Sequence, residues 1–188
     1  MKLNNTYFIL RHGGSKCNVE EFVCSWPEKI DSPLTEEGKK QIGNVVPRIK
    51  KEKIDLVFSS DLLRTKQTAQ IVSKALGLKV KFDKRLREYD FGIFNGKPAE
   101  EWHNFFKDGK DVFYKRPPGG ESRRDIRKRM LDFIKEIDKK YKDKRILIVS
   151  HREPLLELQC GLMGLTDSEI YDDSVELRLD TGEFRKII

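Results

Sequence analysis

Short apolar runs alternate along the chain with segments whose apolar residues recur at helical spacing. Three runs have the length and composition of buried strands, residues 7–10, 54–58 and 145–150, and residues 78–82 predict a further short strand. Between them, apolar residues three or four positions apart predict amphipathic helices. Strands that alternate with helices are typical of a parallel sheet joined by right-handed crossovers. We therefore expect an α/β protein with three α/β/α layers around a mainly parallel central sheet.

The first long helix is predicted to begin after Thr35, whose hydroxyl is a typical N-cap and which is followed by two glutamates. Apolar residues between Ile42 and Ile49 continue at helical spacing. Pro47 interrupts the pattern, and we expect it to kink or shorten the helix because proline lacks a backbone N–H. The polar segment 14–33 before this helix has no period, and loops of this length are usually functional or disordered.

Later helices carry their own boundary signals. Leu62 begins a helix that has Arg64 in its first turn and Gly77 as its C-terminal cap. Ser122 and Asp125 resemble a capping box. They precede the clearest amphipathic helix of the chain, whose apolar face comprises Ile126, Met130, Phe133, Ile134, Ile137 and Tyr141.

Two prolines open shorter helices in this interpretation. Pro98 is predicted to begin a helix that turns Trp102, Phe105 and Phe106 inward, and Pro154 to begin the helix after the last buried run.

The C-terminal segment has strand character on both sides of a turn. Residues 175–179 and 183–187 flank Asp180-Thr181-Gly182. This pattern predicts a C-terminal hairpin or an antiparallel strand at the edge of the sheet.

Length and composition indicate a single globular domain, residues 1–188, with 37% hydrophobic and 37% charged residues. No stretch approaches the roughly 20 apolar residues of a membrane span, so we expect no membrane association. The N-terminus leads directly into the first strand, which argues against a signal peptide. Cys17, Cys24 and Cys160 lack metal-ligand spacing and leave an odd thiol, which favours a reducing cytoplasm.

The formal net charge of +7 favours an anionic ligand, either a phosphorylated small molecule or a nucleic-acid backbone. Much of the excess lies in residues 50–53 and 139–145, which interleave acids and contain few aromatic residues. Such runs are typical of solvated helix ends. We therefore expect a phosphorylated small-molecule substrate and no nucleic-acid partner, and the sequence favours no particular oligomeric state.

Side chains suited to phosphate chemistry follow three of the predicted strands. Arg11 and His12 end the first, Ser60 and then Arg64 follow the second, and His151 follows the last. Taken alone, Arg11 and His12 fit a solvated strand end better than an active site. Because the carboxyl ends of parallel strands meet at one edge of a sheet, however, all of these side chains can converge.

This convergence is what a phosphoryl group requires. An imidazole can attack phosphorus, and the planar guanidinium matches phosphate oxygens. We interpret His12 as the nucleophile and Arg11 as its phosphate clamp. A carboxylic acid is the usual proton donor to the leaving oxygen, and Glu88 is our candidate, although by itself it also fits an exposed loop carboxylate.

Six short motifs follow one another over most of the chain, and each motif alone is weak evidence for a family. They are Arg11-His12-Gly13 with Ser15 and Asn18; Ser32-Pro33-Leu34-Thr35-Glu36-Glu37-Gly38; Ser59-Ser60-Asp61-Leu62-Leu63-Arg64-Thr65 with Thr68-Ala69; Leu86-Arg87-Glu88 with Phe91-Gly92 and Gly96; Pro118-Gly119-Gly120-Glu121-Ser122; and Val149-Ser150-His151. In combination the chain resembles the histidine phosphatase superfamily, in its phosphoglycerate mutase-like branch.

The resemblance implies a role for each matched residue. His12 would become the phosphohistidine, and Glu88 would act first as the acid and then as the base for the water that releases phosphate. The phosphate ligands would be Arg11, Asn18, Arg64 and His151. No metal or organic cofactor is implied, and the sequence shows no metal-ligand cluster.

Two positions depart from the family pattern. Gly14 stands where the family usually has Glu or Gln, and Arg152-Glu153 follow the second histidine where it usually has Gly. Arg152 is therefore expected to adopt a mildly strained backbone or to shift its loop. It then either distorts the pocket or adds an anion contact that narrows substrate choice. We favour the anion contact because all the chemical residues are retained.

Three functions fit this pattern. The first is a phosphatase acting on a small phosphomonoester. The second is a mutase that returns the phosphoryl group to a second hydroxyl, but residues 96–117 are short for the insertion that the resemblance associates with mutases. The third is a catalytically weak module that binds a phosphorylated ligand. Residues 16–27 and 97–117 are expected to line the mouth of the pocket and to determine the substrate.

Overall fold

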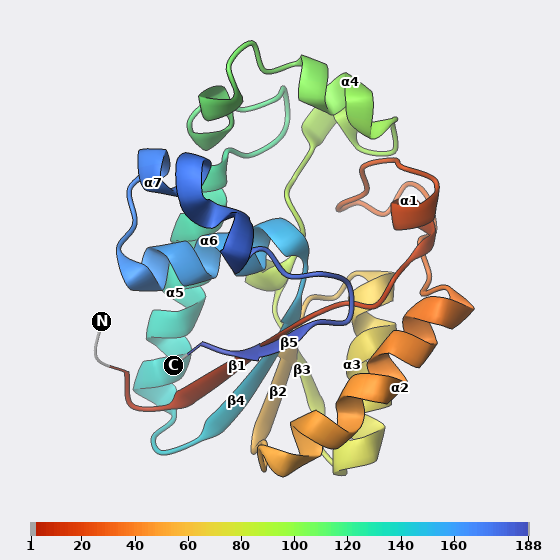
Figure 1. Ribbon diagram of the computed structural model, residues 1–188, viewed down its shortest axis with the longest axis vertical. Coiled ribbons are helices and arrows are strands. Elements are labelled where there is room, and N and C mark those ends of the chain that lie inside the picture. Colours follow the sequence, from red (N-terminus) through yellow and green to blue (C-terminus); the bar gives the residue numbers. More distant parts are fainter. Residues whose placement is uncertain (1–2, 188) are drawn as a thin grey trace.

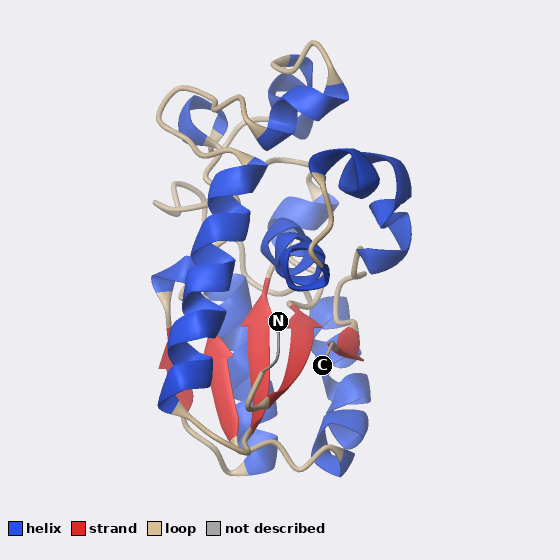
Figure 2. Cartoon of the chain, turned by 90° about the vertical axis from the view of Figure 1, so that its left-hand side faces the viewer, coloured by secondary structure: helices blue, strands red, loops and turns tan. Residues whose placement is uncertain are grey.

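A five-stranded sheet forms the centre of the molecule (Figures 1 and 2). The computed structural model describes residues 3–187, except for the side chains of residues 172–175. The strand order is β3-β2-β4-β1-β5, and every neighbouring pair is parallel except β1 with β5. The strands are β1 (Thr6–Arg11), β2 (Leu56–Ser59), β3 (Val80–Phe82), β4 (Arg145–Ser150) and β5 (Phe184–Lys186).

Helices cover both faces of this sheet, which confirms the predicted three-layer α/β/α fold. The helices α2 (Glu36–Lys51) and α3 (Leu63–Leu76) lie on one face. On the other face lie α5 (Arg123–Lys140) and α6 (Arg152–Met163). Figure 2 shows the strands between these two layers.

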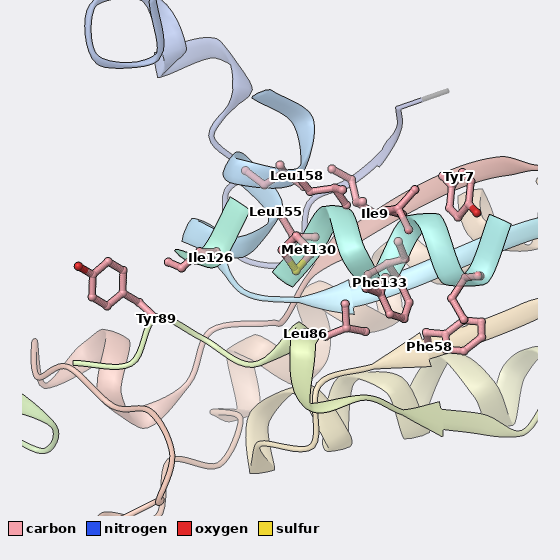
Figure 3. Packing of buried hydrophobic residues seen from close by; sticks show 14 of the residues in the cluster. Tyr7, Ile9, Phe58, Leu86, Tyr89, Ile126, Met130, Phe133, Leu155 and Leu158 are labelled. Atoms are coloured by element: carbon pink, nitrogen blue, oxygen red, sulfur yellow. The ribbon is translucent and has the colours of Figure 1, made fainter. Parts of the chain in front are cut away.

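The central strands are apolar on both faces because both faces are covered. On the α5 and α6 side, Tyr7 and Ile9 of β1 belong to the same core as Met130 and Phe133 of α5 (Figure 3). On the α2 and α3 side, the alternate residues of β1 pack against the helices, beginning with Phe8. This double burial explains why the sequence shows continuous apolar runs where a half-exposed strand would alternate.

The predicted helix boundaries are largely confirmed. Thr35 accepts the backbone N–H of Gly38, Ser122 and Asp125 form a capping box, and Gly77 ends α3 in the left-handed conformation with φ of 69°. The helix after β4 begins at Arg152, two residues before the predicted Pro154. Proline is tolerated in the first turn because the N–H that it lacks would have no partner within the helix there.

Pro47 does not shorten its helix, so shortening, one of its two expected effects, is not found. Helix α2 continues from Glu36 past Pro47 to Lys51. Pro47 is exposed, whereas Val45 and Ile49 on either side of it are buried in the core. The burial of Val45 and Ile49 stabilises the helix at the turn where Pro47 donates no backbone hydrogen bond. The carbonyl that would have accepted this bond lies on the solvent-facing side of the helix.

The C-terminal segment forms one strand and no hairpin. Residues 183–187 contain β5, which pairs antiparallel with β1 at the edge of the sheet and confirms the predicted edge strand. Residues 175–179 are not a strand, because Ser174–Leu177 form the 3₁₀ helix η4. Leu179 is instead buried in the core beside α5 and α6.

Two irregular segments rise above the carboxyl edge of the sheet (Figure 1). The first contains α1 (Lys16–Val19) and the second contains α4 (Ala99–Asn104). Backbone hydrogen bonds join them, from Val23 N–H to the Lys97 carbonyl and from Ala99 N–H to the Glu21 carbonyl. The Trp102 side chain of α4 is buried, as predicted.

The remaining elements are short. They are the helix α7 (Asp167–Asp173) and the 3₁₀ helices η1 (Lys84–Leu86), η2 (Gly92–Phe94) and η3 (Gly109–Phe113). In the part of the chain that the structure describes, no helix is both long and apolar enough to cross a membrane.

Candidate active site

The ends of three adjacent strands deliver the central side chains of the site. His12 follows β1, His151 follows β4 and Ser60 follows β2, and β4 lies between the other two strands. The register pairs Arg11 with Ser150, so the two histidines leave the sheet at the same level. The predicted meeting of these side chains at one sheet edge is confirmed, because parallel strands carry their carboxyl ends to the same side.

The two imidazoles and Arg64 are in mutual reach. The rings of His12 and His151 have centroids 5.2 Å apart at an angle of 63°. Arg64, in the first turn of α3, donates from Nε to His12 Nε2 at 3.2 Å and from one terminal nitrogen to the Cys24 carbonyl at 3.0 Å. All three side chains are buried, at 2% exposure or less. An anion that entered beside them would therefore meet fixed donors.

The hydrogen bonds of His12 determine which ring nitrogen carries the proton. Nδ1 lies 2.8 Å from the Gly13 carbonyl, which only accepts, so Nδ1 donates. Nε2 faces Arg64, which only donates, so Nε2 accepts. Burial, followed by the charges of Arg64 and Arg11, lowers the pKa of His12 well below its ordinary value. His12 is therefore a neutral imidazole with its lone pair on Nε2, which is the form needed for attack on phosphorus.

His151 is placed between a hydroxyl and a carboxyl. Its Nε2 lies 2.9 Å from Ser60 Oγ, and its Nδ1 lies 4.0 Å from Glu88 Oε2. Burial and the charge of Arg64 lower the pKa of His151 well below its ordinary value. The second imidazole is therefore also neutral at neutral pH.

Glu88 lies on the irregular segment between η1 and η2, where one carboxyl oxygen accepts the Tyr89 N–H at 2.9 Å. Burial raises the pKa of Glu88, although the charge of Arg64 opposes this effect. The environment therefore shifts this carboxyl toward the protonated acid, which is the form that donates a proton.

The Pro-Gly-Gly-Glu-Ser motif positions the Glu88 backbone. Arg129 donates to the Glu88 carbonyl at 3.2 Å and is held by Glu121 at 2.7 Å. Gly92 has a φ of 54°, and a Cβ at Gly92 or Gly120 would overlap backbone atoms of the other segment. Only glycine permits this close approach, which explains why the two motifs occur together.

Three buried nitrogens of the site have no hydrogen-bond partner. Among the described residues, seven buried side-chain polar atoms lack a partner, and they include Arg11 Nε, a terminal nitrogen of Arg64 and His151 Nδ1. The Arg11 guanidinium is otherwise anchored to the Leu179 carbonyl at 2.8 Å. Buried polar groups are normally satisfied, so this concentration of unpaired nitrogens matches a site built to bind an anion.

Arg11, His12, Arg64 and Glu88 line a cavity of about 720 Å³ that opens to solvent, and the buried His151 lies beside His12 and Glu88. We call Arg11, His12, Arg64, Glu88 and His151 the floor of the site. We call residues 17–24 and 98–103, together with Arg152 and Glu153, the wall. Both predicted mouth segments, 16–27 and 97–117, contribute to the wall and so are confirmed as parts of the cavity.

Asn18 lies in the wall, where its Oδ1 accepts from the Ser15 backbone at 3.1 Å and from the Ser15 hydroxyl at 2.8 Å. These two hydrogen bonds also cap α1. The side-chain oxygen is thus held, and the amide nitrogen is the group with which Asn18 can contact an anion.

Arg152 occupies the first position of α6 with helical geometry, so the expected strained backbone was wrong. The side chain is 49% exposed, lines the cavity and donates from Nε to Glu153 at 3.0 Å. Glu153 in turn faces Arg123 at 3.7 Å. Burial raises the pKa of Glu153, but Arg123 and Arg152 outweigh this effect and hold its pKa below the ordinary value. Arg152, the second departure from the family pattern, is therefore a cation of the wall that is paired with Glu153.

Gly14 lies where the chain meets α2. Its N–H donates to Gln41 Oε1 at 2.8 Å, and its carbonyl accepts the Thr35 N–H. A Cβ on Gly38 would overlap the Gly14 carbonyl, so the Ser-Pro-Leu-Thr motif and the Arg-His-Gly motif pack backbone against backbone. This contact supports the segment that carries His12.

One contact of the wall was not predicted from the sequence: the segment around Cys24 also holds Arg64. The carbonyl of Cys24 accepts from this arginine, and the thiols of Cys17 and Cys24 both lie in the wall. The available signal was the position of Cys17 directly before Asn18, within the loop that follows Arg-His-Gly. Among the described residues, no group of three or more His, Cys, Asp or Glu side chains is arranged to hold a metal ion.

Comparison with known proteins gives one family. The family model described as "Histidine phosphatase superfamily (branch 1)" matches residues 7–178. Phosphoserine phosphatase 1 of Hydrogenobacter thermophilus is 29% identical over 168 residues, covering 87% of this chain and 78% of that protein. A probable phosphoglycerate mutase GpmB of Yersinia enterocolitica is 35% identical over 168 residues, with 84% and 74% covered.

A solved structure agrees with this assignment. The alpha-ribazole phosphatase from Shigella flexneri superimposes with a TM-score of 0.80 at 25% identity, covering 95% of this chain and 88% of that one. The similarity therefore extends over nearly the whole fold, including the strands that end at the candidate site.

Proposed function

Because the chain belongs to the histidine phosphatase superfamily, we propose that it hydrolyses a small phosphomonoester through a phosphohistidine on His12. The observation that carries this proposal is the neutral His12, whose Nε2 accepts from Arg64 beside unpaired nitrogens of Arg11 and His151. These groups together provide a nucleophile and donors for the oxygens of one phosphoryl group. The names of two similar proteins, a phosphoserine phosphatase and an alpha-ribazole phosphatase, support the same reaction class.

In the first step, His12 Nε2 attacks phosphorus and the bond from phosphorus to the ester oxygen breaks. Arg11, Arg64 and His151 stabilise the charge on the equatorial oxygens, and Asn18 adds its amide nitrogen. Glu88 gives its proton to the leaving oxygen, which departs as an alcohol.

In the second step, the resulting Glu88 carboxylate takes a proton from water. The water oxygen attacks the phosphohistidine, the bond from phosphorus to Nε2 breaks, and inorganic phosphate forms. Glu88 and His12 are thereby returned to their starting protonation states. The raised pKa of Glu88 suits both roles, because the carboxyl gains and loses one proton per cycle.

The wall supports a compact substrate with a second anionic group. Arg152 is half exposed toward the cavity, whereas the floor arginines are directed at the phosphoryl position. We propose that Arg152 contacts this second group. The proposal further includes a cytoplasmic location, independence of metals and organic cofactors, no nucleic-acid partner, and a single domain over residues 1–188.

The second candidate function is a mutase. It is favoured by the similarity to a probable phosphoglycerate mutase, and both functions share the first step. They differ in the acceptor, because a mutase must exclude water until a second hydroxyl arrives. Transfer from one phosphoglycerate isomer to another, without release of phosphate, would replace the phosphatase assignment with this one.

The test is turnover of p-nitrophenyl phosphate and of phosphorylated small metabolites, with a chelator present. We expect phosphate release, and His12→Ala should lower it by at least about 10³-fold because the nucleophile is removed. His103→Ala is the comparison variant: His103 lies in the wall, so its loss can change KM but should leave kcat close to the wild-type value. Tight phospholigand binding without turnover at neutral and mildly acidic pH would instead identify a binding module.

A further inference from the structure

The wall of the cavity changes in character from its buried part to its exposed part. The buried members that border the cavity are apolar side chains or thiols, namely Cys17, Val23, Cys24 and Trp102. The exposed members that border it include the carboxylates of Glu20, Glu21 and Glu100. Beyond the floor, the wall is therefore apolar where it is shielded from water, and these carboxylates lie where it is open to solvent.

Three aromatic side chains contribute to this apolar part. Phe22 is half-buried, Phe91 and Trp102 are buried, and all three line the cavity. The rings of Phe91 and Trp102 have centroids 5.4 Å apart at an angle of 90°, and the Trp102 ring also lies 5.3 Å from that of Tyr89. Edge-to-face contacts of this kind hold aromatic rings in place, so this part of the cavity has a preformed aromatic surface.

Backbone contacts hold Phe22 beside the segment that carries α4. Phe22 and Pro98 form an antiparallel bridge. On either side of it, the Val23 carbonyl accepts from the Gly96 N–H at 2.8 Å and the Val23 N–H donates to the Lys97 carbonyl at 2.9 Å. A leaving group that extends from the phosphoryl group into the wall therefore meets an ordered surface.

The chemistry of this surface distinguishes between kinds of leaving group. A hydroxyl group that moves from water onto buried apolar side chains loses hydrogen bonds without replacement, whereas an apolar ring gains free energy by leaving water. The cavity of about 720 Å³ also has room for a ring beside the phosphoryl group. An apolar leaving group therefore fits the buried wall better than a polyol.

We propose that the preferred substrate is a phosphomonoester whose leaving alcohol carries an apolar ring, and that Phe22, Phe91 and Trp102 contact this ring. The inference rests on the proposed phosphatase function and names its substrate class. It adds to the anionic group assigned to Arg152, because that side chain enters the cavity from α6, whereas the ring contacts come from the segments that carry α1 and α4 and from the residue before η2.

The experiment compares propyl phosphate, 3-phenylpropyl phosphate and glucose 6-phosphate. All three are esters of primary alcohols, so their leaving oxygens need the same proton and differences in KM report on the wall. Burial of the phenyl ring should lower KM by roughly tenfold or more relative to propyl phosphate. Glucose 6-phosphate has a polar ring of similar size and should bind no better than propyl phosphate. Equal KM values for the propyl and phenylpropyl esters, or the lowest KM for glucose 6-phosphate, would overturn the proposal.

Two variants locate the ring. Phe22→Ala should raise KM for 3-phenylpropyl phosphate by roughly fivefold while changing that for propyl phosphate by less than about twofold, because only the former contacts this side chain. Trp102→Leu should act in the same direction, and having both variants guards against poor folding of one. Phe105→Ala is the matched control, since Phe105 is a half-buried aromatic residue directly after α4 that lies outside the cavity lining. Equal increases for both esters in Phe22→Ala and Trp102→Leu would contradict the ring contact.

Phosphonate binding keeps the test independent of turnover. In butylphosphonate and 4-phenylbutylphosphonate a methylene group replaces the ester oxygen, so neither compound can be hydrolysed at that position. Calorimetric titration should give a Kd that is roughly tenfold lower for the phenyl compound. If no ester is turned over and this difference is found, the phosphatase function fails while the ring contact stands. If esters are turned over and the two Kd values are equal, only the ring contact fails.

Discussion

The floor and the wall of the cavity are built by different means. Most floor side chains lie at the end of a strand or in the first turn of a long helix, and Glu88 lies on the segment between η1 and η2. His12, Arg64 and His151 are almost completely buried. The wall consists mainly of two irregular segments joined by a few backbone hydrogen bonds, and its members Glu20, Glu21 and Glu100 are exposed. The floor is therefore rigid and shielded, whereas the wall is open to solvent and tolerant of sequence change.

This difference assigns separate tasks to the two regions. Residues that must meet a phosphoryl group within tenths of an ångström lie on the sheet edge, where register determines their positions. Residues that contact the rest of the substrate lie on loops, where sequence can vary without disturbing the chemistry. Both departures from the family pattern agree with this division. Gly14 supports the chain beside α2, and Arg152 extends into the wall from the first position of α6, the helix whose N-cap is His151.

The largest effect should come from the floor carboxyl. Glu88→Gln should lower kcat by roughly 10²–10⁴-fold for alkyl phosphates, because the leaving alkoxide then lacks its acid. The loss should be much smaller for p-nitrophenyl phosphate, whose leaving group needs no proton. Glu36→Gln on the exposed surface of α2 is the control. Equal losses on both substrates would show that Glu88 is not the acid.

The pH profile of the same variant sharpens this test. The acid must be protonated, so wild-type activity on alkyl phosphates should fall as pH rises through the raised pKa of Glu88. His12 must be neutral, and its lowered pKa places the acidic limb below the ordinary histidine range. In Glu88→Gln the alkaline limb should disappear while the acidic limb remains. The rate is measured across the pH range. The activity is then measured again after the protein is returned from each pH extreme, which checks that both limbs are reversible.

An intermediate effect is expected from the second floor cation. Arg64→Lys keeps the charge but removes the planar fork that contacts both His12 Nε2 and the Cys24 carbonyl. We expect a loss of about 10²-fold in kcat/KM, with the larger part in kcat, because the donors act mainly on the transition state. Arg48→Lys, an exposed substitution on α2, is the matched control. A loss confined to KM would place Arg64 in ground-state binding alone.

The smallest effect is expected from the wall. Arg152→Ala should raise KM by roughly tenfold for phosphomonoesters that carry a carboxylate, and should change p-nitrophenyl phosphate turnover by less than about twofold, since only the former has a second anion. Arg124→Ala removes the same charge from a side chain that is 63% exposed outside the cavity, and serves as the control. If both substrates lose kcat equally, Arg152 belongs functionally to the floor and the division between the two regions fails.

Local signals predicted the elements best where the core agrees with them. The capping box at Ser122 and the cap at Gly77 are formed as expected, and the central strands β1 and β4 are buried on both faces. The failures have tertiary causes. Helix α2 continues through Pro47 because its neighbours are buried. Residues 175–179 form no strand, since Ser174–Leu177 are helical and Leu179 packs into the core.

The sequence alone determined the chemical character of the site, because arginine, histidine and carboxyl side chains suit only certain reactions. The ends of the buried runs also show where such side chains leave the sheet. Contacts between residues that are far apart in the sequence were decided by the tertiary structure alone. The tautomer of His12, the unpaired nitrogens and the contact of Arg64 with the Cys24 carbonyl depend on distances of a few ångströms. Such distances follow from packing between distant segments, and a linear pattern contains no measure of them.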